Sequence, residues 1–421
     1  MKLSNDKNEE EDRDEEFSRF TVRKNEVSSS PEEKKDQFGK ISKLENEENI
    51  YVSAKQITKT CEEALEKGRF HETLSGFIDP LLSEGTENLL LFRYKGIFLS
   101  LVGKNDEALQ FFDKVLEKEP NDYVTLDNKA SVLFNLGKFK EAIEWYTKEL
   151  ELYPDHENAL YNKGLALNLL GRYEEAIEWF DKALEVNPKD TNALYSKGLA
   201  LDSLGRYDDE IESYDKALEI NPECEFALYN KGLAFDNLGK YNEEIEYYDK
   251  ALKINPKDEF ALSNKGLALD NLGRYTEAID WYNKALEINP QNENAINNKG
   301  LTLHHLENYN EAIEWYNKEL EINPENENAL HNKGLALHHL GNYSEAIEWY
   351  NKALEINPDH ENALNNKGFA LDGLGKFREA IECYDRALEI NPEQENALYN
   401  KGLALHHLGK YTEAIEWYNK A

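Results

Sequence analysis

The chain has 421 residues, with 83 acidic and 49 basic side chains and a formal net charge of −34. This charge disfavours nucleic acid as a partner, because phosphates are bound by clustered lysines and arginines. The apolar fraction of 40% is too high for a wholly disordered chain, while 31% charged residues exclude a membrane protein.

Residues 1–53 are rich in charge and have no apolar period, which predicts a disordered charged tail. The N-terminus has no apolar signal segment, and no run approaches the ~18 apolar residues of a spanning helix. The three cysteines, Cys61, Cys224 and Cys383, have no paired spacing and indicate no disulfide framework. We therefore expect a cytoplasmic protein that does not contact membranes.

Residues 54–88 resemble a degraded helical hairpin. Gly68, Arg69 and Phe70 stand where a turn between two helices is expected, and Pro80 falls in the second half. A terminal unit has one face without a neighbour, so its sequence is expected to diverge. We interpret this segment as a divergent capping hairpin.

A strict 34-residue period begins at Leu89. Nine prolines carry it: Pro120, Pro154, Pro188, Pro222, Pro256, Pro290, Pro324, Pro358 and Pro392. A fixed period of this length predicts a solenoid. With each proline numbered as position 32, ten repeats fill residues 89–421, and the last is truncated at Ala421, its position 27.

Each repeat contains two helical patterns. In residues 157–190 the first pattern places Leu160, Gly164 and Leu167 on one side, and the second carries a broad apolar stripe. Asn187 can take the left-handed conformation that ends a helix, and Pro188 cannot continue one. The pattern predicts an all-α, right-handed superhelical solenoid of tandem antiparallel helix hairpins.

The repeat resembles the tetratricopeptide repeat family through Gly164, Ala176, Phe180, Ala183 and Pro188. The resemblance implies a protein-interaction scaffold rather than an enzyme, with the first helices lining a concave groove. Position 7 departs from the family pattern because it is lysine in all ten repeats, from Lys95 to Lys401. We expect these lysines to pack their stems between helices and to reach solvent or carboxylates with their ammonium groups.

Position 6 forms what we call the asparagine row. It comprises Asn128, Asn162, Asn230, Asn264, Asn298, Asn332, Asn366 and Asn400, with Ser196 in repeat four. Asparagine is a poor residue for a helix interior, but its amide complements one peptide unit. The row resembles the asparagine ladder by which members of the family hold a peptide backbone. The alternative is that recently copied repeats carry inert asparagines.

Other positions on this side of the first helices are expected to select the side chains of a ligand. They are Tyr161, Tyr195 and Tyr229 at position 5, Asp202, Asp236 and Asp270 at position 12, and the pairs His304–His305, His338–His339 and His406–His407 at positions 12 and 13. If the histidines line a groove, affinity should change near pH 6.5. A metal site on these pairs is disfavoured, because we expect neighbouring repeats ~10 Å apart.

The six tryptophans all fall at position 23, where we expect them to pack between units. No nucleophile motif, phosphate loop or cofactor site is recognisable. The predicted partner is an extended, basic or neutral segment of a protein or peptide. Two alternatives stay open: an arm of a larger enzyme whose catalytic domain follows residue 421, and a self-associating structural solenoid.

Overall fold

The computed structural model describes residues 54–83 and 87–421, and these residues contain helices but no strand. The predicted tail, residues 1–53, lies outside the described residues. The chain divides into two compact units after Pro222. No described helix is both long and apolar enough to cross a membrane.

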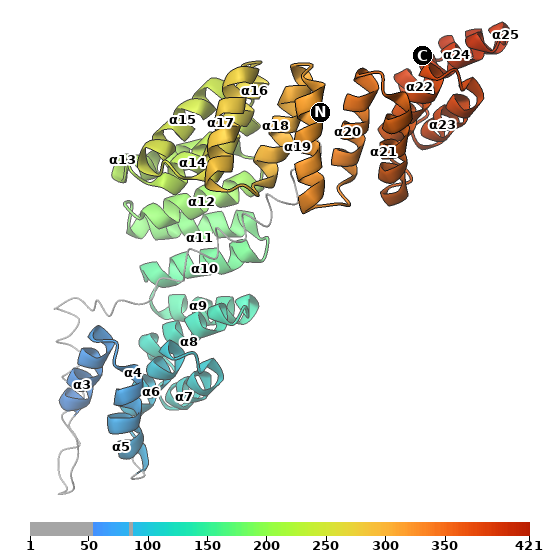
Figure 1. The fold of residues 1–421 in the computed structure, drawn as a ribbon. Helices are drawn as coiled ribbons and strands as arrows, with labels where there is room; N and C mark the ends of the chain where they lie inside the picture. Colours follow the sequence, from blue (N-terminus) through green and yellow to red (C-terminus); the bar gives the residue numbers. More distant parts are fainter. Residues whose placement is uncertain (1–53, 84–86) are drawn as a thin grey trace, which may run out of the picture. The chain divides into compact units, whose positions relative to one another are not determined.

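The first unit begins with short helices and continues with four hairpins (Figure 1). The short helices are α3 (Ala54–Glu66), α4 (Phe70–Thr73), the π-helix η1 (Leu74–Ile78) and α5 (Asp79–Ser83). The hairpins pair α6 (Leu89–Leu101) with α7 (Asn105–Lys118), α8 (Tyr123–Asn135) with α9 (Phe139–Leu152), α10 (Glu157–Leu169) with α11 (Tyr173–Val186), and α12 (Thr191–Ser203) with α13 (Tyr207–Ile220).

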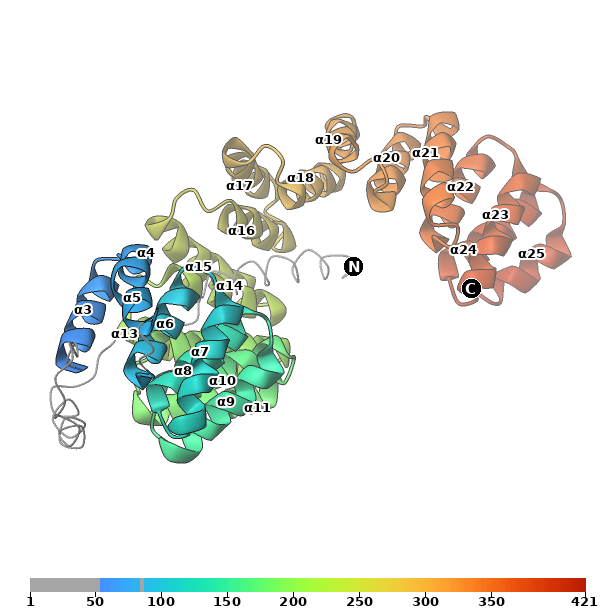
Figure 2. The same cartoon turned by 90° about the horizontal axis from the view of Figure 1, so that it is seen from below.

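The second unit contains six hairpins, which follow one another in Figure 2. They pair α14 (Glu225–Asn237) with α15 (Tyr241–Ile254), α16 (Glu259–Asn271) with α17 (Tyr275–Ile288), α18 (Glu293–His305) with α19 (Tyr309–Ile322), α20 (Glu327–His339) with α21 (Tyr343–Ile356), α22 (Glu361–Gly373) with α23 (Phe377–Ile390), and α24 (Glu395–His407) with α25 (Tyr411–Tyr418). The predicted all-α solenoid of tandem hairpins is confirmed, with helices and turns where the repeat places them.

The two helices of a hairpin approach closely at position 8. A Cβ atom added to Gly266 would lie 2.6 Å from Cε1 of Tyr282, at position 24 of the same repeat. Tyr282 is fully buried, as is every position-24 ring from repeat one to repeat nine. The glycine therefore makes the space that an aromatic ring fills, and this contact sets the distance between the helices.

The residues that end the helices differ from the prediction at one position. Asn187 has φ −129° and is extended rather than left-handed. Its Oδ1 accepts a hydrogen bond from Lys189 N at 3.1 Å, and its amide donates to Glu157 at 3.0 Å. The left-handed residue is instead Gly171, with φ 71°, which follows the first helix. Asparagine at position 31 thus forms a side-chain turn that starts the loop to the next repeat.

Position 34 caps the first helix of the following repeat, a role that the sequence reasoning did not assign. Asp190 Oδ1 accepts hydrogen bonds from the backbone N–H groups of Asn192 and Ala193 at 3.0 and 3.2 Å. Asp122, Asp258, Asn292 and Asn326 also cap through their side-chain oxygens. The signal was present, because these residues are preferred N-caps and precede each helix.

Repeat seven carries the one described non-glycine residue with a positive φ, Glu307 at φ 58°. The other repeats have glycine at this position, which adopts this conformation without a Cβ penalty. We expect Glu307→Gly to raise the free energy of unfolding of the second unit by roughly 1 kcal/mol. Urea denaturation followed by circular dichroism measures this change.

The matched control is the reverse substitution in repeat six, Gly273→Glu, where φ is 73°. It should destabilise the protein by a similar amount. If Gly273→Glu lowers the free energy of unfolding but Glu307→Gly leaves it unchanged, the positive φ of Glu307 is not a source of strain in repeat seven. That outcome would contradict the prediction.

Candidate functional site

The position-7 lysines and the tryptophans form a repeated sandwich between helices. In repeat six, Lys265 Nζ lies 3.6 Å from the centroid of the Trp281 ring, and Lys284 Nζ lies 3.5 Å from it. Lys265 also forms an ion pair with Asp249 of the preceding repeat. The lysine row therefore joins consecutive repeats, with stems packed and ammonium groups paired as expected.

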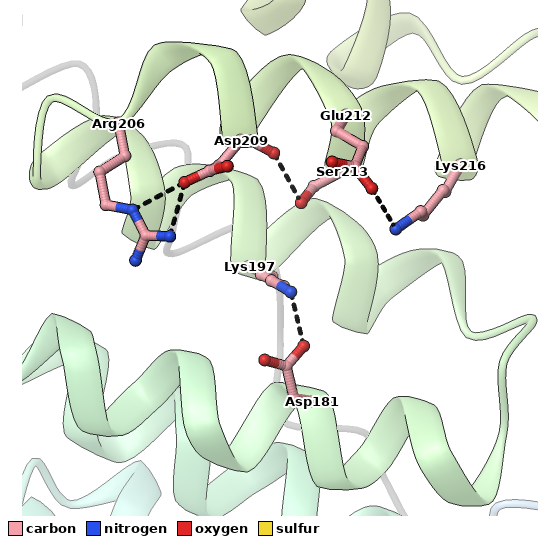
Figure 3. A network of polar contacts seen from close by, with 7 residues as sticks. All are labelled: Asp181, Lys197, Arg206, Asp209, Glu212, Ser213 and Lys216. Atoms are coloured by element: carbon pink, nitrogen blue, oxygen red, sulfur yellow. Dashed lines mark hydrogen bonds and ion pairs between the residues drawn. The ribbon is translucent and has the colours of Figure 1, made fainter.

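Figure 3 shows this joint in repeat four, which has serine in place of tryptophan. Lys197 of α12 donates to Asp181 of α11 at 2.5 Å. Without a tryptophan ring beneath it, Lys216 pairs with Glu212 on its own helix at 2.7 Å. The inter-repeat ion pair thus persists when the ring is missing.

The position-7 lysines do not form a free basic surface. Lys231 and Lys265 are only 3% and 6% exposed, and five other members of the row are also buried, whereas Lys95, Lys197 and Lys367 are half-buried. Where position 25 of the preceding repeat is asparagine instead of aspartate, no carboxylate there compensates the positive charge of the lysine. Burial, together with the charge of Lys352, lowers the pKa of Lys333 to about 8, and its partner is Asn317. Buried cations of this kind are not available to nucleic acid phosphates.

The asparagine row is placed at the contact between neighbouring first helices. Asn264 Nδ2 donates to Tyr229 Oη at 3.0 Å, and Asn400 Nδ2 donates to Asn365 Oδ1 at 3.2 Å. In repeat four, Ser196 Oγ lies 3.2 Å from Tyr161 Oη. Each of these bonds links position 6 of one repeat to position 5 of the repeat before it. Sequence reasoning assigned both positions to a ligand and missed this bond.

The position-5 tyrosines of the first unit are packing residues. Tyr161 and Tyr195 are both 2% exposed, and their rings lie against Phe180 and Tyr214 of their own hairpins. The expectation that these two rings line an open groove is therefore corrected. Position 5 borders the position-24 ring, so a large residue there closes the core of the hairpin. Tyr229 is half-buried and contacts Tyr248 in the same way.

Members of the asparagine row differ in what their amides bind. The amides of Asn128 and Asn230 donate to the backbone carbonyls of Val124 and Phe226, four residues earlier. Asn162 is fully buried. Asn298 is half-buried, and its amide makes no hydrogen bond with any other residue that the structure describes. Asn298 is therefore the member of the row best placed to bind a ligand.

The histidine pairs hold the aromatic rings of position 17. The histidine at position 12 packs edge-on against the ring of its own repeat, as His304 does with Tyr309 at 5.0 Å between centroids. The histidine at position 13 packs against the ring of the preceding repeat, as His339 stacks on Tyr309 at 4.8 Å. His304 and His339 lie 5.3 Å apart between centroids, so the expected separation of ~10 Å was wrong for these rings.

The histidines divide into two environments. His304 and His338 are half-buried, and burial together with the charge of His339 lowers the pKa of each to about 4. These two imidazoles stay neutral near pH 6.5, which corrects the expectation of a charge change there. His305 on α18, His339 on α20, and His406 and His407 on α24 are exposed and remain open to a partner.

The aspartates of position 12 are closer to the joint than expected. Asp270 accepts a hydrogen bond from Thr302 Oγ1 of the next repeat at 2.5 Å, and its Oδ2 lies 3.9 Å from His305 Nδ1. Burial raises the pKa of Asp270, which the bond from Thr302 partly offsets. Asp202 and Asp236 also interact within the chain. These carboxylates therefore already have partners within the protein, and a ligand that binds them would have to share them.

Four glutamates are buried at positions where most repeats have alanine. Glu210 and Glu244 replace alanine at position 20, and Glu149 and Glu319 replace it at position 27. Burial and the charge of Asp236 raise the pKa of Glu244 to about 9, so this carboxyl is neutral at pH 7. The available signal was a charged residue at a position that is alanine in most other repeats.

Comparisons with known proteins cover most of the repeats. A family model described as tetratricopeptide repeat matches residues 122–189, 155–223, 291–355 and 325–393. Three further models with the same description match residues 227–258, 260–292 and 366–421. A search of the curated proteins returned no match.

Three solved structures illustrate the likeness. The chain is 30% identical to MamA over 40% of its own length and 92% of that chain, with a TM-score of 0.39. It is 24% identical to YrrB, described as a TPR protein with an unusual peptide-binding site, over 45% and 97% of the two chains, with a TM-score of 0.41. It is 17% identical to yeast Tom70 over 79% and 91%, with a TM-score of 0.39.

The inter-repeat bond of the asparagine row can be tested by stability. Asn366 Nδ2 lies 2.9 Å from Nε2 of His331, which is 8% exposed. Asn366→Ala should cost about 1–3 kcal/mol, because it leaves a buried ring nitrogen without a partner. Asn298→Ala is the matched control and should change stability by less than about 0.5 kcal/mol, because no partner is abandoned. Urea denaturation compares them, and equal effects would contradict the assigned bond.

Glu244 should make stability depend on pH. Its pKa is raised from the ordinary value to about 9, so its stabilising effect is present below about pH 4.5 and is lost as pH rises through 9. Glu244→Ala should therefore stabilise the second unit by more than about 1 kcal/mol at pH 8, and by less at pH 5.

Thermal unfolding at the two pH values measures the effect of Glu244→Ala. The exposed neighbour Glu243 provides the control, since Glu243→Ala should leave the pH dependence unchanged. The same pH profile in wild type and Glu244→Ala would contradict the assignment of a neutral buried carboxyl.

Proposed function

This chain belongs to the tetratricopeptide repeat family, a family of protein-interaction scaffolds, and we propose that its asparagine row binds the backbone of an extended peptide. The single observation that carries the proposal is the amide of Asn298, which is half-buried and makes no hydrogen bond within the described chain. An amide of this kind offers a donor pair and an acceptor, the complement of a peptide unit.

The spacing of the row suits an extended ligand. Consecutive first helices of the second unit bring one position-6 side chain each, at Asn230, Asn264, Asn298, Asn332, Asn366 and Asn400. Packed helices lie about 10 Å apart, and an extended chain rises about 3.3 Å per residue. One amide would therefore meet every third residue of the ligand.

The anchor of this arrangement is repeat seven. Asn264, Asn366 and Asn400 already use their amides at the joints between repeats, so they can hold a peptide only by sharing or exchanging a bond. Asn298 has no bond to give up. We therefore place the strongest backbone contact at Asn298, with weaker contacts on either side.

Exposed imidazoles provide side-chain selection. Positions 6 and 13 are seven residues apart, about two helical turns, so they lie on one face of a first helix. His305 and His339 are exposed on the helices that carry Asn298 and Asn332. The half-buried carboxylate of Asp270 and the net charge of −34 disfavour an acidic peptide. The ligand class is a basic or neutral extended segment.

The proposal predicts a specific loss of binding in Asn298→Ala. Peptide libraries of basic, neutral and acidic composition are screened against the full chain by fluorescence anisotropy. We expect basic or neutral ligands, and we expect Asn298→Ala to weaken them about tenfold, the effect of losing one paired hydrogen-bonding group. The variant should keep its fold because the amide has no hydrogen-bond partner among residues 54–83 and 87–421.

The control places the same substitution outside the row. Asn310 is exposed at the start of the second helix of the same repeat, and Asn310→Ala should leave affinity unchanged. The triple variant Asn264→Ala, Asn298→Ala and Asn332→Ala should abolish measurable binding. Unchanged affinity of the triple variant for every ligand found would disprove the asparagine mechanism.

A further inference from the structure

Three potential metal ligands meet in repeat two of the first unit. Asp127 of α8, Glu149 of α9 and His156, which precedes α10, each place one ligand atom within 4.8 Å of the other two. His156 Nδ1 lies 2.6 Å from Glu149 Oε1. The three residues come from two helices and a turn, so the fold rather than local sequence brings them together.

The three residue types occur together only in this repeat. Position 27 is glutamate in repeats two and seven, whereas repeats three to six and eight to ten have alanine. In repeat seven the corresponding glutamate is Glu319, but its neighbours are Asn297 at position 5 and Asn326 at position 34. Repeat two thus combines, at three positions that converge in space, residue types that no other repeat combines.

His156 does not cap the helix that follows it. Position-34 side chains in several other repeats cap the next helix, whereas the side chain of His156 makes no capping hydrogen bond. It turns toward Glu149 instead. Loss of a cap costs about 1 kcal/mol, so the local helix is stabilised less than its equivalents.

The site buries two carboxyl groups beside a single imidazole. Glu149 is 0% exposed and Asp127 is 3% exposed. Glu149 Oε2 is buried and has no hydrogen-bond partner among the described residues. Burying a carboxylate without a compensating charge is costly. The buried Oε2 of Glu149, which has no donor among the described residues, is the second observation that indicates a cation.

We propose that Asp127, Glu149 and His156 bind a divalent transition-metal ion of the zinc type. Two carboxylates and one imidazole form a ligand set that such ions accept, at about 2.0–2.2 Å from each ligand atom. Tetrahedral ligands at these distances are about 3.4 Å apart. His156 Nδ1 and Glu149 Oε1 must therefore separate by roughly 1 Å as the ion replaces the proton between them.

The ion would connect repeat two to the start of repeat three, since its ligands lie on α8, on α9 and just before α10. Binding should stabilise the first unit, because an ion that binds only the folded state shifts the folding equilibrium. Acid should weaken binding, since protons compete for the imidazole and the carboxylates. Burial alone would lower the pKa of His156, but the hydrogen bond and charge of Glu149, with the charge of Asp127, raise it.

The sister repeats supply conservative test variants. Glu149→Ala, His156→Asn and Asp127→Asn each install the residue found at the same position in repeat six, seven or nine. Metal-free full-length protein is titrated with Zn²⁺ by calorimetry at pH 7.5, and its thermal midpoint is measured with and without Zn²⁺. We expect each variant to bind at this site at least about tenfold more weakly and to lose the Zn²⁺-dependent rise in midpoint.

Glu319→Ala is the matched control, because it makes the same substitution at the same position without the aspartate and the histidine. It should leave the Zn²⁺ affinity and the thermal shift unchanged. The double variant His406→Asn and His407→Asn identifies any weaker binding by exposed histidines and should leave the site intact. Zn²⁺ binding that is equal in wild type and Glu149→Ala, or that falls equally in Glu319→Ala, would overturn the proposal.

A gain of binding tests the same ligand set in the second unit. Asn297→Asp combined with Asn326→His rebuilds the three residue types around Glu319. We expect the stoichiometry of Zn²⁺ to rise by one and the added site to disappear with Glu319→Ala. A folded double variant with unchanged stoichiometry would contradict the claim that these three positions form a metal site.

Discussion

The close contact between position 8 and position 24 sets the helix spacing on which the other contacts of this structure depend. A glycine on the first helix leaves room for a phenylalanine or tyrosine ring of the second, and an added Cβ atom at Gly198 would lie 2.3 Å from the ring of Tyr214. Interiors packed at this density leave no freedom in helix spacing. Because the spacing repeats, the residues around the ring also repeat, including position 5 on one side and position 20 on the other.

The joints between repeats are polar, in contrast to the apolar interior of each hairpin. In most repeats, the lysine at position 7 contacts the aspartate or asparagine at position 25 of the preceding repeat, as Lys401 does with Asp385. In several repeats the side chain at position 6 forms a hydrogen bond with position 5 of the preceding repeat, as Asn400 does with Asn365. These contacts are directional, so they fix the register of one hairpin on the next more narrowly than apolar packing does. A partner that binds the asparagine row would interact directly with these joints.

The repeats are most informative where they differ. Alanine at positions 20 and 27 keeps the second helix close to its neighbours, yet Glu244 and Glu149 are accepted there with 1% and 0% exposure. A buried carboxyl can be retained by taking up a proton or by finding a counter-charge. Glu244 illustrates the first solution, with a pKa of about 9. Glu149 lies 2.6 Å from the imidazole of His156, which makes the second solution possible. Residues that differ from the consensus of the repeats thus indicate sites where a buried carboxyl group changes the local electrostatics.

The sequence alone determined the fold, because the period of 34, the proline at its end and the glycine and aromatic positions are local and repeated along the chain. It also determined which residues share a face, since helical periodicity decides this. It could not decide which polar groups meet across a joint: the bond between Asn264 and Tyr229 spans 35 residues and depends on how one hairpin rotates on the next. Nor could it show that Asp127, Glu149 and His156 converge, because their distance is set by a helix crossing and a turn. The tertiary structure decided these contacts, since side-chain partners in a solenoid are chosen by the geometry of stacking.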